Sequence, residues 1–166
     1  MTFEIDISDH QRATSVDPEV LRHAVESALQ LEQVAAAILS ISIVDNAAIH
    51  RINREHLQHD YPTDVISFQL EFSRDEIPDP EGSAPELRAS GVRIEGEIIA
   101  SAQMASEMAS AGQWTTMNEL TLYVIHGLLH ICGYDDLTPE EKALMRCRER
   151  AVLGLLSLVP VYPDDE

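Results

Sequence analysis

The residues best suited to chemistry are two histidines four positions apart, followed by a glycine and an acidic pair. They lie in the segment H-G-L-L-H-I-C-G-Y-D-D, residues 126–136. Side chains at positions i and i+4 of a helix share one face about 5–6 Å apart, so His126 and His130 can reach one ion. Gly133 permits the left-handed turn that returns the chain toward that ion. Asp136 then supplies a third ligand, and the pattern predicts a metal site.

The spacing H-x3-H-x2-G-x2-D resembles the ligand spacing of the metzincins, with Asp136 where their third histidine stands. Three protein ligands leave a fourth position for water, which is typical of a catalytic Zn²⁺ site. Two histidines and one carboxylate also suit iron, nickel or manganese. Cys132 lies two residues beyond His130 and so points about 200° around the helix from the ligand face. We interpret it as a core residue.

The usual base of a zinc peptidase is absent, because Gly127 follows the first histidine where HExxH enzymes carry glutamate. Base catalysis must then come from metal-bound hydroxide, from Asp135 or from a residue elsewhere. His126 and Asp135 are therefore the candidate catalytic residues. An isolated i,i+4 histidine pair is often incidental. Here the glycine and the acid at ligand spacing, together with the apolar residues around the pair, favour metal binding.

Charge limits the classes of partner. The chain has 166 residues, with 11 Lys and Arg against 29 Asp and Glu, and a formal charge of −18. Such a surface repels phosphate backbones and anionic lipids, which excludes nucleic-acid binding through a broad basic face and disfavours a membrane partner. The N-terminus lacks the pattern of a signal peptide, and the two cysteines are few for a secreted protein. We expect a cytoplasmic protein whose thiols are free.

Periodicity predicts early strands and late helices, hence an α+β fold: one domain, a small mixed sheet with packed helices, and the metal site on a helix and the turn after it. The predicted strands are Phe3–Ile7, Ala37–Val44, Asp64–Leu70 and Val92–Ala100. The predicted helices begin after Asp17, Asp45, Ser101, Thr116 and Thr138. Capping boxes are predicted at Thr116–Glu119, which opens the helix of the two histidines, and at Thr138–Glu141.

Two further segments are distinguished by composition. Residues 71–91 contain three prolines, two glycines and six acids, which predicts a solvated loop, either a flap over a site or a tolerated insertion. We expect the single domain to span residues 1–157 and to end in an acidic tail, 158–166.

These residues resemble the YbeY family of bacterial rRNA maturation endoribonucleases. Residues 126–136 match ten of the eleven positions of that family's box H-G-x-L-H-x-x-G-Y-D-H. Residues 60–68 resemble its second block, D-x-P-T-D-V-L-S-F. The resemblance covers about residues 39–150.

The resemblance implies a single α+β domain and a metal-dependent endoribonuclease specific for single strands. Its role would be 3′-end maturation of small-subunit rRNA and ribosome quality control. The partners would be the rRNA precursor, the small ribosomal subunit and assembly factors. Two positions depart from the family: Asp136 replaces the third zinc histidine, and Leu57 replaces an arginine associated with RNA phosphate. Arg51 or Arg54 is a candidate to take over that contact.

Two other functions remain open. A ribosome-assembly binding protein with a structural metal and weak or no nuclease activity is favoured by Leu57 and by the charge of −18. A metal-dependent hydrolase of peptides or amides fits the acidic surface but lacks the glutamate base at Gly127.

Overall fold

The sheet is mixed, as the sequence predicts. A computed structural model describes residues 1–74 and 87–162, and within these ranges four strands form one sheet in the order β1-β2-β4-β3. The strands are β1 (Thr2–Asp9), β2 (Ala36–Val44), β3 (Val65–Ser73) and β4 (Arg93–Ser101). β1, β2 and β4 are parallel, and β3 runs antiparallel to β4 at one edge.

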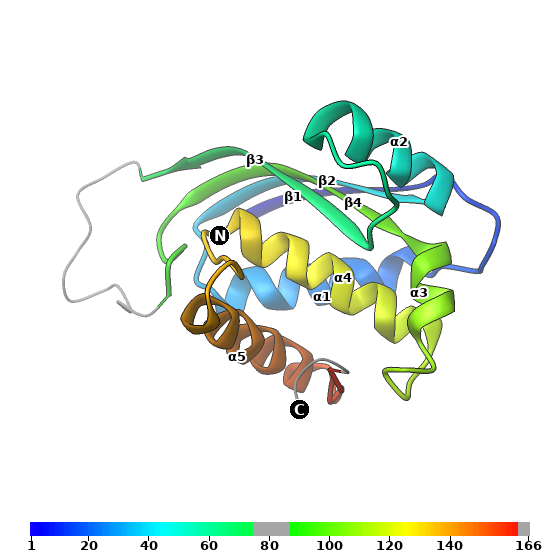
Figure 1. The fold of residues 1–166 in the computed structure, drawn as a ribbon. Helices are drawn as coiled ribbons and strands as arrows, with labels where there is room; N and C mark the ends of the chain where they lie inside the picture. Colours follow the sequence, from blue (N-terminus) through cyan, green and yellow to red (C-terminus); the bar gives the residue numbers. More distant parts are fainter. Residues whose placement is uncertain (75–86, 163–166) are drawn as a thin grey trace.

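Helices cover both faces of this sheet (Figure 1). α1 and α4 pack on one face, α5 lies beneath them as an outer layer, and α2 lies on the opposite face. The helices are α1 (Pro18–Leu31), α2 (Asn46–Leu57), α3 (Ala102–Met108), α4 (Thr116–Ile131) and α5 (Pro139–Leu155). The predicted α+β class is confirmed.

Two apolar clusters follow from the alternation of strand residues. The larger lies between the sheet and the α1–α4 layer, where Leu39, Ile41 and Ile98 are buried. The smaller lies under α2 and contains Ile49 and Ile66. Burial of this apolar surface on both sides is the main force that holds the helices to the sheet.

The N-cap of helix α4 lies one residue earlier than predicted. The predicted box Thr116–Glu119 is wrong, because the Thr115 hydroxyl accepts the backbone N–H of Asn118 at 3.1 Å. The Glu119 carboxylate instead accepts a hydrogen bond from the Trp114 indole at 2.9 Å. The predicted cap at Thr138 is confirmed by its bond from the Glu141 N–H.

The predicted loop 71–91 is shorter than expected, because β3 continues through Ser73. Residues 75–86, where a flap was considered, lie outside the described residues. Leu158 and the buried Tyr162 pack with Leu153 of α5, while 163–166 are not described. The domain limit at residue 157 stays a prediction. Within the described ranges, no helix is long and apolar enough to cross a membrane.

Gly96 allows the end of α4 to approach the sheet closely. A Cβ at this position would lie 2.6 Å from Ile131 Cδ1 and 2.8 Å from the Phe68 carbonyl oxygen. Gln69 links strand β3 to the end of α4, because its Nε2 donates to the Ile131 carbonyl at 2.9 Å. Gly96 therefore permits the short distance between the end of α4 and strands β3 and β4.

Replacing Gly96 with alanine should destabilise the fold, because the backbone carbonyl of Phe68 cannot yield as a side chain can. We expect Gly96→Ala to lower the free energy of unfolding by about 1–3 kcal/mol in urea titrations. Gly154→Ala is the matched control: nothing lies within 4 Å of a Cβ in that exposed helical position. It should raise stability by up to about 1 kcal/mol. A Gly96→Ala protein as stable as the parent would contradict the close approach.

Candidate metal centre

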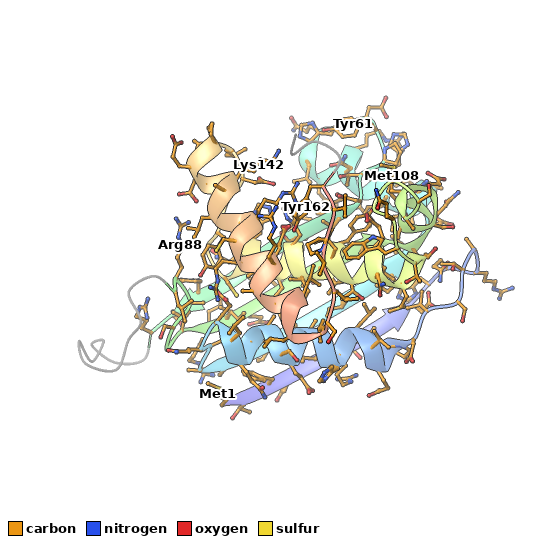
Figure 2. All side chains as sticks on the ribbon, turned by 90° about the horizontal axis from the view of Figure 1, so that it is seen from below. Met1, Tyr61, Arg88, Met108, Lys142 and Tyr162 are labelled. Carbon is orange, nitrogen blue, oxygen red and sulfur yellow. The ribbon has the colours of Figure 1, made fainter. Side chains whose placement is uncertain are left out.

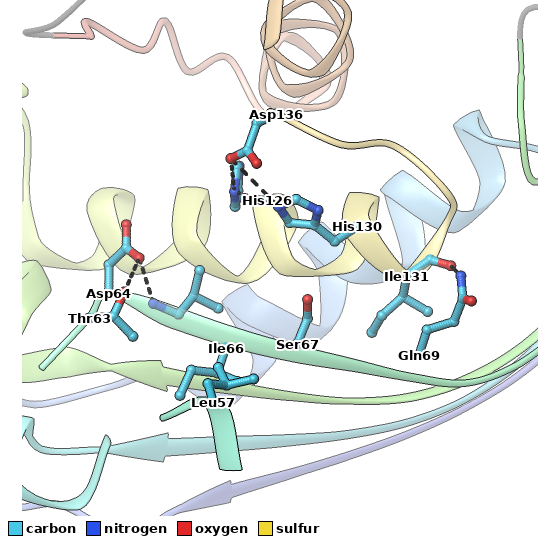
Figure 3. Close-up of a pocket in the computed structure, with 11 residues that line it drawn as sticks. Leu57, Thr63, Asp64, Ile66, Ser67, Gln69, His126, His130, Ile131 and Asp136 are labelled. Carbon is cyan, nitrogen blue, oxygen red and sulfur yellow. Dashed lines mark hydrogen bonds and ion pairs between the residues drawn. The ribbon is translucent and has the colours of Figure 1, made fainter. Parts of the chain in front are cut away.

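Three side chains converge as the spacing predicts (Figure 3). His126 and His130 lie on one face of α4, with their Nε2 atoms 3.0 Å apart. Gly133, at φ +99°, reverses the chain after the helix. Asp136 then returns, and its Oδ2 lies 3.3 Å from His126 Nε2 and 3.7 Å from His130 Nε2. The donor atoms all lie within 4.8 Å of one another, so the three residues can hold one metal ion.

His126 is oriented by a buried carboxylate on α5. Glu149, which is 0% exposed, accepts a hydrogen bond from His126 Nδ1 through Oε2 at 2.9 Å. Its Oε1 accepts from Arg146 at 2.9 Å and from the Tyr162 hydroxyl at 2.8 Å. Tyr162 lies beside α5 (Figure 2), and the Arg146 guanidinium stacks 3.8 Å from its ring. With Nδ1 donating to Glu149, His126 directs Nε2 toward Asp136, and a metal ion bound there would replace the Nε2 proton.

His130 is oriented by backbone rather than by a carboxylate. Its Nδ1 donates to the carbonyl oxygen of Tyr134 at 3.1 Å. The acceptor belongs to the turn that also carries Asp136, so the turn orients one candidate ligand and carries another. Both histidines therefore present Nε2 to the same point.

The electrostatics of the three residues favour positive charge at that point. Burial lowers the pKa of His126, but hydrogen bonds to Asp136 and Glu149 outweigh it and raise the pKa to about 9. The hydrogen bond from His126 lowers the pKa of Asp136. Burial and the neighbouring His126 lower the pKa of His130, which keeps its ring neutral and able to ligate. Two carboxylates around one charged imidazole create a site that favours a cation.

Two cavities meet at His126 and Asp136, and His130 lines the larger of them. The larger, about 440 Å³, lies between α4, β3 and the end of α2. Figure 3 shows the His126, His130 and Asp136 side chains on one wall and Leu57 on the other. Ser67, on the edge strand β3, also lines the larger cavity.

The second cavity, about 300 Å³, extends from the same point toward α3 and the C-terminal segment. Its walls include Tyr123 and Arg146. Both cavities share Asp64, His126 and Asp136.

Packing explains why no glutamate follows the first histidine. A Cβ on Gly127 would lie 3.1 Å from Ile98 Cγ2 and 3.1 Å from Val65 Cγ2. Position 127 thus faces β3 and β4, so a side chain there would meet the sheet instead of the cavities.

The other candidate residues are placed differently. Asp135 lies outside the group of three, and its Oδ1 accepts the N–H of Asp136 at 2.7 Å. Its catalytic role stays a prediction. Arg51 and Arg54 are exposed on α2, and neither is among the described residues that line the two cavities. Leu57 does line the larger cavity. Cys132 is buried in the core, and both cysteines are free, as expected.

Sequence reasoning missed Glu149 and its partners. A signal was present: Glu149 lies on the face of α5 that buries Met145, Val152 and Leu153. A carboxylate on an apolar face requires a buried partner. The identity of that partner, His126, depends on how α5 packs on α4, which periodicity does not reveal.

The model of the family described as Endoribonuclease YbeY matches residues 6–157. The chain belongs to the YbeY family. It is 40% identical over 148 residues to an Endoribonuclease YbeY from Rhodopirellula baltica, covering 88% of this chain and 68% of that protein. It is 37% identical over 163 residues to the Endoribonuclease YbeY of Bacillus licheniformis, covering 95% and 98% of the two chains. The sequence-based assignment to the YbeY family is confirmed, and it supports a nuclease role.

A solved structure has the same fold. The solution structure of TM1509 from Thermotoga maritima matches with a TM-score of 0.55 and 22% identity. The match covers 92% of this chain and 91% of that one. The chain therefore shares its α+β architecture with a protein of low sequence identity.

The Glu149 carboxylate should determine how tightly a metal is held. Glu149→Gln weakens the acceptor that orients His126, and we expect the affinity for Zn²⁺ to fall about 10–100-fold. Competition with a chromophoric chelator measures this affinity, and circular dichroism checks the fold. Glu140→Gln, on the exposed first turn of α5, is the control and should bind as the parent does. Equal affinity of Glu149→Gln and the parent protein would refute the orienting role.

Proposed function

We propose that this YbeY protein is a metal-dependent endoribonuclease that cleaves single-stranded RNA. Its biological role would be 3′-end maturation of small-subunit rRNA and ribosome quality control in the cytoplasm. The observation that carries the proposal is the convergence of His126, His130 and Asp136 in a chain of this family, at a place where two cavities share His126 and Asp136. Such a junction fits a phosphodiester within a strand better than a free end.

The donor set fits zinc. With ligand bonds of about 2.0–2.2 Å in a tetrahedron, ligand atoms lie roughly 3.3 Å apart. The distances among His126 Nε2, His130 Nε2 and Asp136 Oδ2 are 3.0, 3.3 and 3.7 Å. Three ligands leave one position of the tetrahedron for water or substrate. Because one ligand is a carboxylate, iron, nickel and manganese are further candidates.

Bound at these residues, Zn²⁺ would acidify a water and stabilise negative charge on a phosphoryl oxygen. The chain itself supplies the geometry. His126 and His130 hold their Nε2 atoms in fixed directions, and Asp136 adds one negative charge, which makes the centre a weaker Lewis acid than three histidines would. Two nucleophiles fit the reaction, water or the adjacent ribose 2′-OH. A 2′,3′-cyclic phosphate product would identify the 2′-OH.

The charge of −18 bears on how RNA arrives. Free RNA should bind weakly and with strong dependence on salt, because repulsion acts over the whole surface. We propose that the small ribosomal subunit and assembly factors deliver the single-stranded substrate to the centre.

Loss of a ligand should abolish cleavage. His126→Ala and a chelator should each reduce cleavage of single-stranded RNA by about 100-fold or more, because both remove the metal. His56→Ala, an exposed histidine on α2, is the control and should retain activity. Gel analysis of a labelled oligonucleotide provides the measurement.

Unchanged cleavage by His126→Ala would contradict the proposal. If a folded His126→Ala protein lacks cleavage but still complements a ribosome-assembly defect, the binding-protein alternative is favoured. Cleavage of casein but not of RNA would favour a peptide hydrolase.

The larger cavity lacks an arginine at position 57, and restoring one should strengthen RNA binding. Leu57→Arg places a guanidinium where the cavity wall is apolar, and one phosphate contact should raise kcat/KM on RNA about tenfold. Leu70→Arg adds the same charge to the exposed end of β3, where Leu70 is 58% exposed. It should have little effect. Equal gains from both variants would mean that overall charge, rather than this cavity, limits binding.

A further inference from the structure

A second buried carboxylate lies behind the metal centre. Glu32, at the end of α1, is 0% exposed. Its Oε1 accepts a hydrogen bond from the Tyr134 hydroxyl at 2.7 Å. Its Oε2 accepts from Arg148 Nε at 3.0 Å and also pairs with Arg148 Nη2. A buried charge is tolerated only when it is paired and hydrogen-bonded, so these contacts are tightly constrained.

This arrangement parallels that around Glu149. Each carboxylate is fully buried and binds one arginine and one tyrosine. Both arginines, Arg146 and Arg148, lie on α5, a helix that contributes no ligand of its own. The Glu149 group acts directly on His126. The Glu32 group has no direct contact of this kind, and its connection to the centre is through Tyr134.

Tyr134 lies between two ligands in the chain and joins them. Its carbonyl oxygen accepts from His130 Nδ1 at 3.1 Å, and Asp136 follows two residues later. Its ring is 2% exposed, and the Arg88 guanidinium lies 5.2 Å from the ring centroid. Arg88 also donates to the Gly133 carbonyl at 2.9 Å. The hydroxyl bond to Glu32 fixes the far end of this side chain.

We propose that Glu32 is a positioning residue of the metal centre, which it serves by anchoring the Tyr134 hydroxyl and thereby the carbonyl that orients His130. This inference rests on the metal centre of the proposed function. Two backbone hydrogen bonds tie the start of this turn to α4, from the Gly133 N–H to the His130 carbonyl and from the Tyr134 N–H to the Leu129 carbonyl, each at 3.0 Å. The bond from the Tyr134 hydroxyl to Glu32 adds a side-chain anchor to them. Without the anchor, the Tyr134 carbonyl and Asp136 sample more positions, and the ligands lose their pre-organisation.

The two carboxylates act on different ligands, and this predicts a pattern of coupling. Glu32 and Tyr134 belong to one chain of contacts, so removing either should have the same effect as removing both. Glu149 acts on His126 by a separate route, so its loss should add to the loss of Tyr134. Variants in one network are non-additive, whereas independent ones add.

The test measures binding of Zn²⁺ alone to the full-length protein by chelator competition, and the visible spectrum of the Co²⁺ form. Tyr134→Phe removes only the hydroxyl, and Glu32→Gln removes the charge. Thr121→Val is the matched control, because it removes a buried hydroxyl whose bond goes to the Met117 carbonyl on the same helix, α4. Thermal unfolding without metal shows that each variant is folded at the temperature of the assay.

We expect Tyr134→Phe and Glu32→Gln each to weaken Zn²⁺ binding about 10–100-fold and to alter the Co²⁺ spectrum. The Zn²⁺ affinity of the double variant Glu32→Gln/Tyr134→Phe should equal that of the weaker-binding single variant. When Tyr134→Phe is combined with Glu149→Gln, the two fold-losses of affinity should multiply. If Glu32→Gln does not fold, Tyr134→Phe alone decides. Binding by Tyr134→Phe equal to that of Thr121→Val would overturn this inference and leave the metal centre intact. A parent protein that binds no Zn²⁺ would overturn both.

Discussion

The hydrogen bond between Glu149 and His126 is the interaction on which the centre depends. A carboxylate that is 0% exposed must be compensated, and its partners come from α4, α5 and the C-terminal segment. Three parts of the chain that are separate in sequence thus meet at one charge. The same bond sets the direction of His126 Nε2, so folding and ligand geometry are determined together. The Tyr162 hydroxyl, which is buried, brings the C-terminal segment against this carboxylate.

Local charge and overall charge have opposite consequences. The chain carries −18, which weakens contact with RNA over most of the surface. At the centre, Asp136 and Glu149 stabilise positive charge on the His126 imidazole between them. A metal cation would replace the proton on Nε2 of this ring. The acidic side chains therefore favour binding of a cation at the centre and disfavour binding of an anionic substrate. Under the proposed function, substrate binding would then depend on a few local contacts and on partners that bring RNA to the cavities.

Short-range features could be predicted from the sequence, and long-range ones could not. The grouping of His126, His130 and Asp136 could be predicted because helix periodicity and one glycine bring them together over eleven residues. The mixed sheet followed from strand alternation. Glu32 was not accessible, because its partner Tyr134 lies 102 residues away. The predicted capping box at Thr116 is wrong because the neighbouring Thr115 caps the helix instead, and the Glu119 carboxylate accepts from the Trp114 indole.

X-ray absorption at the zinc edge tests the central claim most directly, on protein loaded with one equivalent of Zn²⁺. The structure predicts two imidazole nitrogens and oxygen ligands at about 2.0–2.2 Å, with no sulfur. The oxygen contribution should diminish in Asp136→Ala. A sulfur ligand at about 2.3 Å, or a spectrum unchanged by Asp136→Ala, would contradict a centre built from His126, His130 and Asp136.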